Sequence, residues 1–122
     1  MKYHEFLKAV RERTGTEDPE EAERTAVAVV QALSDRLAGG EPKDLLSQLP
    51  GELKERVEPI ETAIPMKSEE FVERVAHDLE IDPDEARERV RAVLSVVRDA
   101  VTPGEFEDVL SQLDREYEEL LV

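Results

Sequence analysis

The sequence contains no cysteine, which excludes disulfide bonds, thiol nucleophiles and thiolate metal ligands. It also lacks a long apolar run, because its most apolar segment, residues 26–30, is far shorter than the roughly 20 residues that span a bilayer. No apolar stretch follows the first five residues, so we expect no secretory signal. These absences are typical of a protein in the reducing cytoplasm, and we expect that location and no membrane partner.

The sequence also lacks the short motifs of common enzymes. It has no Gly-x-Ser-x-Gly, no phosphate-binding glycine loop and no dinucleotide fingerprint. Its two histidines, His4 and His77, do not occupy equivalent places in the internal repeat described below. His77 shares a helical face with Glu70 and Glu73, a combination that could bind a metal but is commonly a solvated face. We therefore expect no catalytic residue, no metal and no cofactor.

Basic residues are scarce relative to acidic ones. The chain carries 31 acidic and 16 basic residues, a formal net charge of −15. Such a surface repels nucleic acids and anionic lipids, so we expect no nucleic-acid partner. The excess acidic side chains also repel one another, which lowers the stability of the folded state. Molar salt screens this repulsion, because the Debye length falls to about 3 Å. The composition therefore favours a halophilic protein of a salt-rich cytoplasm, the alternative being an ordinary acidic protein.

Internal repetition determines the expected architecture. Residues 18–58 and 82–122 align without a gap, so that Asp18 matches Asp82, and the two segments are identical at 16 of 41 positions. Upstream, one extra residue in the second half shifts the alignment, which then pairs Phe6 with Phe71. Residues paired in this way are called repeat equivalents below. Because a repeated segment usually forms a repeated structural unit, we expect two copies of one helical unit.

The repeat divides the chain into a first unit at 1–57, a connecting loop at 58–67 and a second unit at 68–122. Large apolar residues prefer burial, so we expect the loop to lie across the boundary between the units. That arrangement would make residues 1–122 a single domain. The loop residues that we expect to be buried are Ile60, Ile64 and Met66.

Each unit is predicted to form three helices and a short fourth, so the expected fold is an all-α bundle of two tandem pseudo-symmetric three-to-four-helix units. The second helix of each unit begins with Asp18-Pro19 or Asp82-Pro83, a capping residue followed by a proline that loses no hydrogen bond there. Gly39-Gly40 and Pro103-Gly104 are expected to end these helices. Their apolar residues have helical spacing: Ala22, Ala26, Val29, Val30, Leu33 and Leu37, and Ala86, Val90, Val93, Leu94, Val97 and Val101.

A ten-residue motif, Gly-Glu-x-x-Asp-x-Leu-Ser-Gln-Leu, occurs at 40–49 and again at 104–113. Glycine ends a helix, glutamate favours the first turn of the next, and glutamine can hydrogen-bond a nearby loop. We expect a structural role, the alternative being a paired recognition element near a pseudo-twofold axis. The positions concerned are Gly40, Glu41, Asp44, Gln48, Gly104, Glu105, Asp108 and Gln112.

The doubled motif, with Pro50 after its first copy, resembles that of domain-of-unknown-function family 2267, small helical proteins of bacteria and archaea. The resemblance extends from Phe6 to Leu121. The second copy departs from the pattern at Asp114, where the first copy has Pro50. The resemblance implies a helical tandem-repeat fold and no particular activity.

Three arginines of the second unit, Arg87, Arg91 and Arg98, fall within about 40° of one another on a helix. Arg87 and Arg91 are like charges at i, i+4, which is unfavourable unless acids reach them. We expect salt bridges to acids of the first unit or the loop. The alternative is a contact site for an anion or a protein partner.

These patterns favour a small cytoplasmic interaction or regulatory module without catalytic activity, acting on a protein partner or on a second copy of itself. The alternative is an enzyme or a small-anion-binding protein that uses the three arginines. A polar pocket holding Arg87 and Arg91 would favour this alternative, and an apolar surface patch would favour the interaction module.

Overall fold

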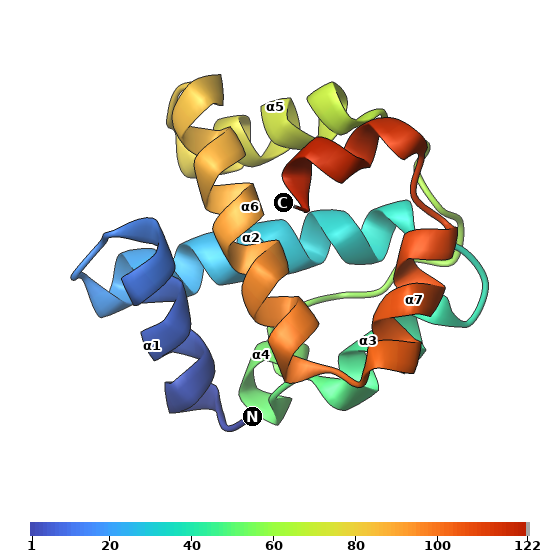
Figure 1. The fold of residues 1–122 in the computed structure, drawn as a ribbon, viewed down its shortest axis with the longest axis horizontal. Helices are drawn as coiled ribbons and strands as arrows, with labels where there is room; N and C mark the ends of the chain where they lie inside the picture. The colour runs from blue at the N-terminus through green and yellow to red at the C-terminus, as the bar shows by residue number, and fades with distance from the viewer. Residues whose placement is uncertain (122) are drawn as a thin grey trace.

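Residues 1–121 are described by the computed structural model, and within that range they form seven α-helices, one 3₁₀-helix and no strand (Figure 1). The prediction of an all-α fold is therefore confirmed. None of the helices in this range is long and apolar enough to cross a lipid bilayer. The elements are α1 (Tyr3–Thr14), α2 (Pro19–Arg36), α3 (Glu41–Gln48), α4 (Gly51–Glu55), α5 (Ser68–Leu79), α6 (Pro83–Ala100), α7 (Pro103–Ser111) and the 3₁₀-helix η1 (Arg115–Leu120).

The long helices α2 and α6 begin where the sequence predicts. The side chain of Asp18 accepts a hydrogen bond from the backbone N–H of Glu20 at 3.0 Å. Asp82 likewise accepts one from the N–H of Glu85 at 3.0 Å. A proline follows each cap at the first helical position, where a missing N–H costs nothing.

The expectations that Gly39-Gly40 ends α2 and that Pro103-Gly104 ends α6 are both wrong. Helix α2 already ends at Arg36, with Leu37 as its C-cap. Helix α6 ends at Ala100, and Pro103 is the first residue of α7. The hydroxyl of Thr102 accepts a hydrogen bond from the N–H of Glu105 at 3.2 Å, so a threonine cap followed by proline starts a new helix here.

The two halves contain helices of matched length. Helices α1 and α5 have 12 residues each, and α2 and α6 have 18 each. Helices α1 and α5 each pack against both long helices, and α3 packs against α7 (Figure 1). Helices of the first half therefore contact helices of the second half throughout. That the two halves superpose stays a prediction of the sequence repeat.

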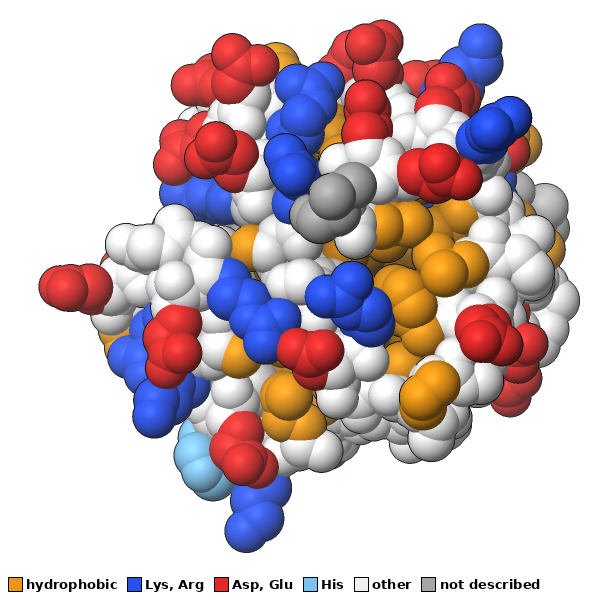
Figure 2. All heavy atoms as spheres, in the orientation of Figure 1, with side chains coloured by type: hydrophobic (Ala, Val, Ile, Leu, Met, Phe, Trp, Pro, Cys, Tyr) orange, Lys and Arg blue, Asp and Glu red, His pale blue; other side chains and the backbone are white. Residues whose placement is uncertain are grey.

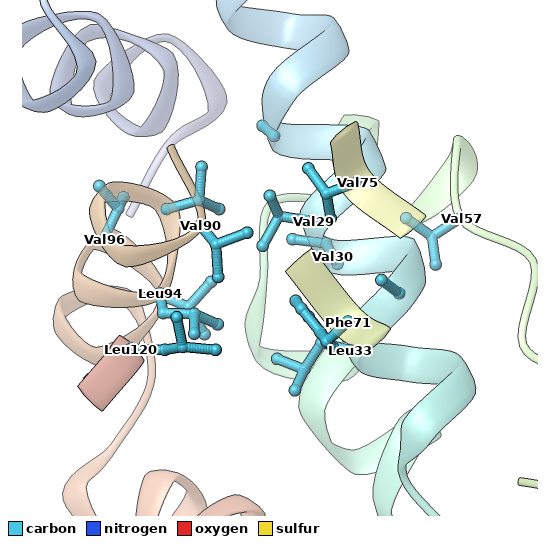
Figure 3. Close-up of a cluster of buried hydrophobic side chains, with 14 of the residues drawn as sticks. Val29, Val30, Leu33, Val57, Phe71, Val75, Val90, Leu94, Val96 and Leu120 are labelled. Atoms are coloured by element: carbon cyan, nitrogen blue, oxygen red, sulfur yellow. The ribbon is translucent and has the colours of Figure 1, made fainter. Parts of the chain in front are cut away.

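One hydrophobic core joins both halves. Figure 3 shows Val29 and Leu33 of α2 beside Phe71 of α5, facing Val90 and Leu94 of α6. These five side chains are at most 2% exposed. Because valine has a modest helix propensity, burial rather than local preference stabilises the long helices.

The loop at 58–67 is tied to α2 by hydrogen bonds. The side-chain amide of Gln31 donates to the backbone oxygen of Glu58 at 2.9 Å and accepts from the N–H of Glu58 at 2.9 Å. The N–H of Ile64 donates to the backbone oxygen of Asp35 at 2.8 Å. The end of the loop is also tied to η1, because the backbone oxygen of Met66 accepts from Arg36 at 3.2 Å and from the hydroxyl of Tyr117 at 2.7 Å.

Burial of the loop residues differs from the sequence prediction. Met66 is buried, as expected, but Ile60 is 40% and Ile64 is 42% exposed. The prediction is wrong for the two isoleucines because the loop is held by its backbone groups and by Met66, which leaves their side chains at the surface.

Two of the ion pairs that join the halves use acids that are repeat equivalents, Asp35 and Asp99. Arg74 of α5 donates a hydrogen bond to the buried carboxylate of Asp35 in α2. Arg13 of α1 donates to the carboxylate of Asp99 in α6 at 2.7 Å. Each long helix thus receives an arginine from the first helix of the other half.

A third polar contact lies where α2 and α6 meet. The guanidinium of Arg89 donates to Glu21 at 2.5 Å, to the hydroxyl of Thr25 at 3.0 Å and to Glu85 at 3.1 Å. Burial lowers the pKa of Arg89, but the hydrogen bonds with Glu21 and Glu85 outweigh it and raise that pKa overall. Thr25 and Arg89 are repeat equivalents, as are Glu21 and Glu85, so one arginine engages both copies of the same glutamate.

We expect Arg89→Ala to lower the free energy of unfolding by about 1–3 kcal/mol, between the values for exposed and buried ion pairs. The reason is that the Arg89 side chain is only 14% exposed and its loss leaves the Oε1 atom of Glu21 without its donor, while Arg24 still pairs with the Oε2 atom. Arg98→Ala is the matched control, because the Arg98 side chain is 52% exposed. Urea unfolding measures the free energy of unfolding of both variants. Equal losses for the two substitutions would contradict the stabilising role assigned to Arg89.

We propose that the chain folds as one domain, because each half supplies helices that cover the other. Separate fragments spanning 1–57 and 68–122 should each be largely unfolded, and mixing them should restore helix. Far-UV circular dichroism measures the helix content. A cooperative thermal transition in either fragment alone would show that the units are independent.

Candidate functional site

The glutamines of the repeated motif exchange hydrogen bonds between the halves. Gln48 accepts from the backbone N–H of Thr102 at 2.8 Å. Gln112 accepts from the N–H of Ala38 at 2.7 Å and donates to its backbone oxygen at 3.3 Å. Ala38 and Thr102 are repeat equivalents. Each glutamine therefore binds the turn that follows the long helix of the other half.

The motif glycines are not required by backbone conformation. Beside the first copy, the glycine in the left-handed region is Gly39, with φ of +66°, which precedes the motif. Gly40 has φ of −83°, and Gly104 lies within α7. A Cβ atom would meet no heavy atom within 4 Å at either motif position. The backbone thus demands glycine at Gly39 rather than at the repeated positions.

The motif acids gather where α3 packs against α7. Glu41, Glu105 and Asp108 each place a carboxylate oxygen within 4.8 Å of the others. Burial, a hydrogen bond with Glu105, and the charges of Glu105, Asp108 and Asp44 raise the pKa of Glu41 from 4.5 to about 8. The histidine combination considered from the sequence lies elsewhere, since the His77 side chain is 92% exposed and is 3.7 Å from Asp78.

An open groove of about 550 Å³, called here the α2–α5 groove, lies along α2 at the end of α5. Its apolar lining residues are Val27, Ala28 and Leu79. Among its charged lining residues, Glu23 accepts a hydrogen bond from the hydroxyl of Tyr3, and the other Glu23 oxygen is 3.6 Å from Arg56. Burial, followed by the contact with Glu23, raises the pKa of Tyr3 to about 12, which keeps this hydroxyl a donor.

A second groove, of about 360 Å³, lies between α6 and α1 and is called here the α1–α6 groove. Its lining residues all have repeat equivalents that line the α2–α5 groove. The equivalent pairs are Arg13 and Asp78, Glu88 and Arg24, Arg91 and Val27, Ala92 and Ala28, and Ser95 and Gln31.

The grooves differ most in charge. Arg13 and Arg91 of the α1–α6 groove stand where the α2–α5 groove has Asp78 and Val27. Glu88 of the α1–α6 groove stands where the α2–α5 groove has Arg24. Arg13 donates to Ser95 at 2.9 Å across the α1–α6 groove, which fixes its guanidinium there. Figure 2 shows lysine and arginine side chains over α6 and α1. Two copies of one surface therefore present different chemistry.

Arg87, Arg91 and Arg98, which we expect to pair with acids of the first unit or the loop, are spread along α6. For Arg87 and Arg98 the acids found nearby belong to α6 instead. Arg91 lines the α1–α6 groove. Arg87 is 3.5 Å from Asp84, and Arg98 is 4.0 Å from Asp99, so each has an acid of α6 itself nearby. Sequence reasoning missed Arg13 and Arg89. Extending the upstream alignment through α1 would have paired Arg13 with Asp78 and marked a charge reversal.

The raised pKa of Glu41 predicts a pH-dependent stability. Protonation of Glu41 favours the folded state, so its contribution is complete below about pH 4.5 and is lost as the pH rises toward about 8. Glu41→Gln should flatten this decline in the free energy of unfolding. Urea unfolding between about pH 5 and pH 8.5, with a chelator present, measures it. Glu52→Gln is the control, because it removes the same charge from an exposed site of α4. If the free energy of unfolding declined equally with pH in both variants, the decline could not be assigned to Glu41.

Comparison with known proteins places the chain in a family. No curated protein matches it. One family profile, described as "Uncharacterized conserved protein (DUF2267)", matches residues 3–120, which is nearly the whole chain. The doubled motif and the helical fold agree with the resemblance drawn from the sequence. The chain belongs to the DUF2267 family.

Proposed function

We propose that this protein is a non-catalytic interaction module that binds a protein partner in the α2–α5 groove. The observation that carries the proposal is the divergence of two equivalent grooves. Val27 beside Ala28 gives one of them an apolar centre, whereas in the other Arg91 stands in place of Val27 beside the matching Ala92. An apolar centre with charged residues around it is the usual anatomy of a protein interface.

The local contacts support a preformed surface. Val27 and Ala28 are partly exposed on α2, while Tyr3 and Arg56 hold Glu23 beside them. A groove whose charged residues are already oriented loses little side-chain freedom when a partner binds. The anion-binding alternative has weaker support, because Arg87 and Arg98 have acidic neighbours on their own helix and lie apart from the groove that contains Arg91.

We further propose a salt-rich cytoplasm as the protein's location. The net charge of −15 and the absence of cysteine support it. The same charge disfavours nucleic acids as partners, because their phosphates would be repelled.

Val27→Arg tests the interaction, because it gives the α2–α5 groove the arginine that the α1–α6 groove has at the equivalent position, Arg91. The substitution should weaken partner binding at least about tenfold, equivalent to about 1.4 kcal/mol, because a charge would face an apolar contact. Arg91→Val makes the reverse exchange and is the control. The partner is recovered with the wild-type protein from its host at native salt, and its affinity for each variant is then measured. Equal affinities for wild type and Val27→Arg, or loss only in Arg91→Val, would reject the α2–α5 groove.

Stability should rise with salt if the acidic surface is an adaptation to a salt-rich cytoplasm. Increasing KCl from about 0.01 M to about 1 M shortens the Debye length from about 30 Å to about 3 Å and screens the repulsion among carboxylates. Thermal unfolding at fixed pH across this series should show a rising midpoint. A flat or falling midpoint would contradict the halophilic assignment.

A further inference from the structure

The acidic cluster at the α3–α7 contact has the composition of a cation site. Glu41 is the first residue of α3, and Glu105 and Asp108 lie one turn apart on α7. Their carboxylate oxygens lie within 4.8 Å of one another. Carboxylate oxygens are the ligands that hard divalent cations prefer. An acidic cluster alone is common on proteins, so the cluster needs a second observation before it indicates a ligand.

The second observation is a buried carboxylate that lacks a partner. Glu105 is only 7% exposed. Within residues 1–121, its Oε2 atom and the Oε1 atom of Glu41 are buried and accept no hydrogen bond from another group. The two acids can hydrogen-bond each other only when one of them carries a proton. Two other acids shielded from solvent are paired with arginines, Asp35 with Arg74 and Glu21 with Arg89. Because an unpaired buried carboxylate is costly, these two oxygens require a proton or a cation.

We propose that Glu41, Glu105 and Asp108 bind one Ca²⁺ ion between α3 and α7. Three oxygens at most 4.8 Å apart can all contact an ion about 2.8 Å or less from each, a range that includes the 2.3–2.6 Å of calcium, whose flexible coordination tolerates an irregular set of ligands. Asp108 and Asp44 are exposed, so water can reach the ion and complete its coordination. The ion would join the first half to the second at a contact separate from both grooves.

The competing occupant is a proton shared between Glu41 and Glu105. In the absence of an ion, burial and the charges of Glu105, Asp108 and Asp44 hold a proton at Glu41. Calcium would have to displace that proton. The affinity for calcium should therefore increase as the pH rises toward the Glu41 pKa of about 8, and binding should release a proton. A shared proton alone predicts no calcium binding at any pH.

Calorimetric titration of the full chain with CaCl₂ tests the proposal, after chelator treatment and in about 1 M KCl to screen diffuse attraction to the acidic surface. We expect saturation at one ion per chain, tighter binding near pH 8 than near pH 6, and a thermal midpoint raised by calcium. Glu105→Gln should weaken binding at least tenfold. Asp108→Asn should also weaken it and, being at an exposed position, serves as the second variant if Glu105→Gln folds poorly.

Glu107→Gln is the matched control, because Glu107 is an exposed acid on the same helix and should retain wild-type affinity. Three results would overturn the proposal. One is no saturable binding by the wild type, which would leave the shared proton as occupant. Another is binding that Glu105→Gln and Asp108→Asn both leave unchanged. The third is equal weakening by Glu107→Gln, which would indicate an ion atmosphere rather than a site.

Discussion

Burial of the apolar faces of α2 and α6 is the constraint on which the rest of the structure depends. Both helices are rich in valine, which lowers helix propensity, so they need tertiary contacts to persist. Helices α1 and α5 provide those contacts by packing against both long helices. Arg89, held by both copies of one glutamate, satisfies the polar groups at the crossing. The short helices pack on this four-helix centre and on one another, with α3 against α2 and α7, α4 against α1, and η1 against α5 and α6.

The sequence predicted those parts of the fold that depend on local chemistry and periodicity. Aspartate-proline starts and helical spacing located α2 and α6, because capping and amphipathic patterns act within one helix. The wrong predictions concern helix boundaries and the burial of loop residues, which depend on contacts that the local pattern does not reveal. Pro103 can follow one helix or start another, and Thr102 decides the outcome by capping α7. Ile64 was expected to be buried because it is apolar, but the hydrogen bond from its N–H to Asp35 fixes the loop with that side chain outside.

The candidate site was less predictable because it depends on which residues of different helices meet. Arg87, Arg89 and Arg91 are closely spaced on α6, and the sequence alone did not show which of them faces α2. The structure places Arg89 there, with Glu21 and Thr25 around it. The motif acids could be named from the repeat, but the approach of Glu41 to Glu105 required the packing of α3 on α7.

Comparison of the two halves separates positions that hold the protein together from positions that distinguish its surfaces. Several of the residues identical in both copies lie at contacts between the halves, among them Asp35 and Asp99, Gln48 and Gln112, and Glu41 and Glu105. A change in one member of such a contact leaves a polar group unpaired, which limits how far the copies can differ there. Val27 of the α2–α5 groove carries no such restriction, because it is apolar and partly exposed and its replacement leaves no polar group unpaired. Arg91 can therefore stand where the other copy has Val27, and the protein can present two surfaces of different chemistry on one repeated frame.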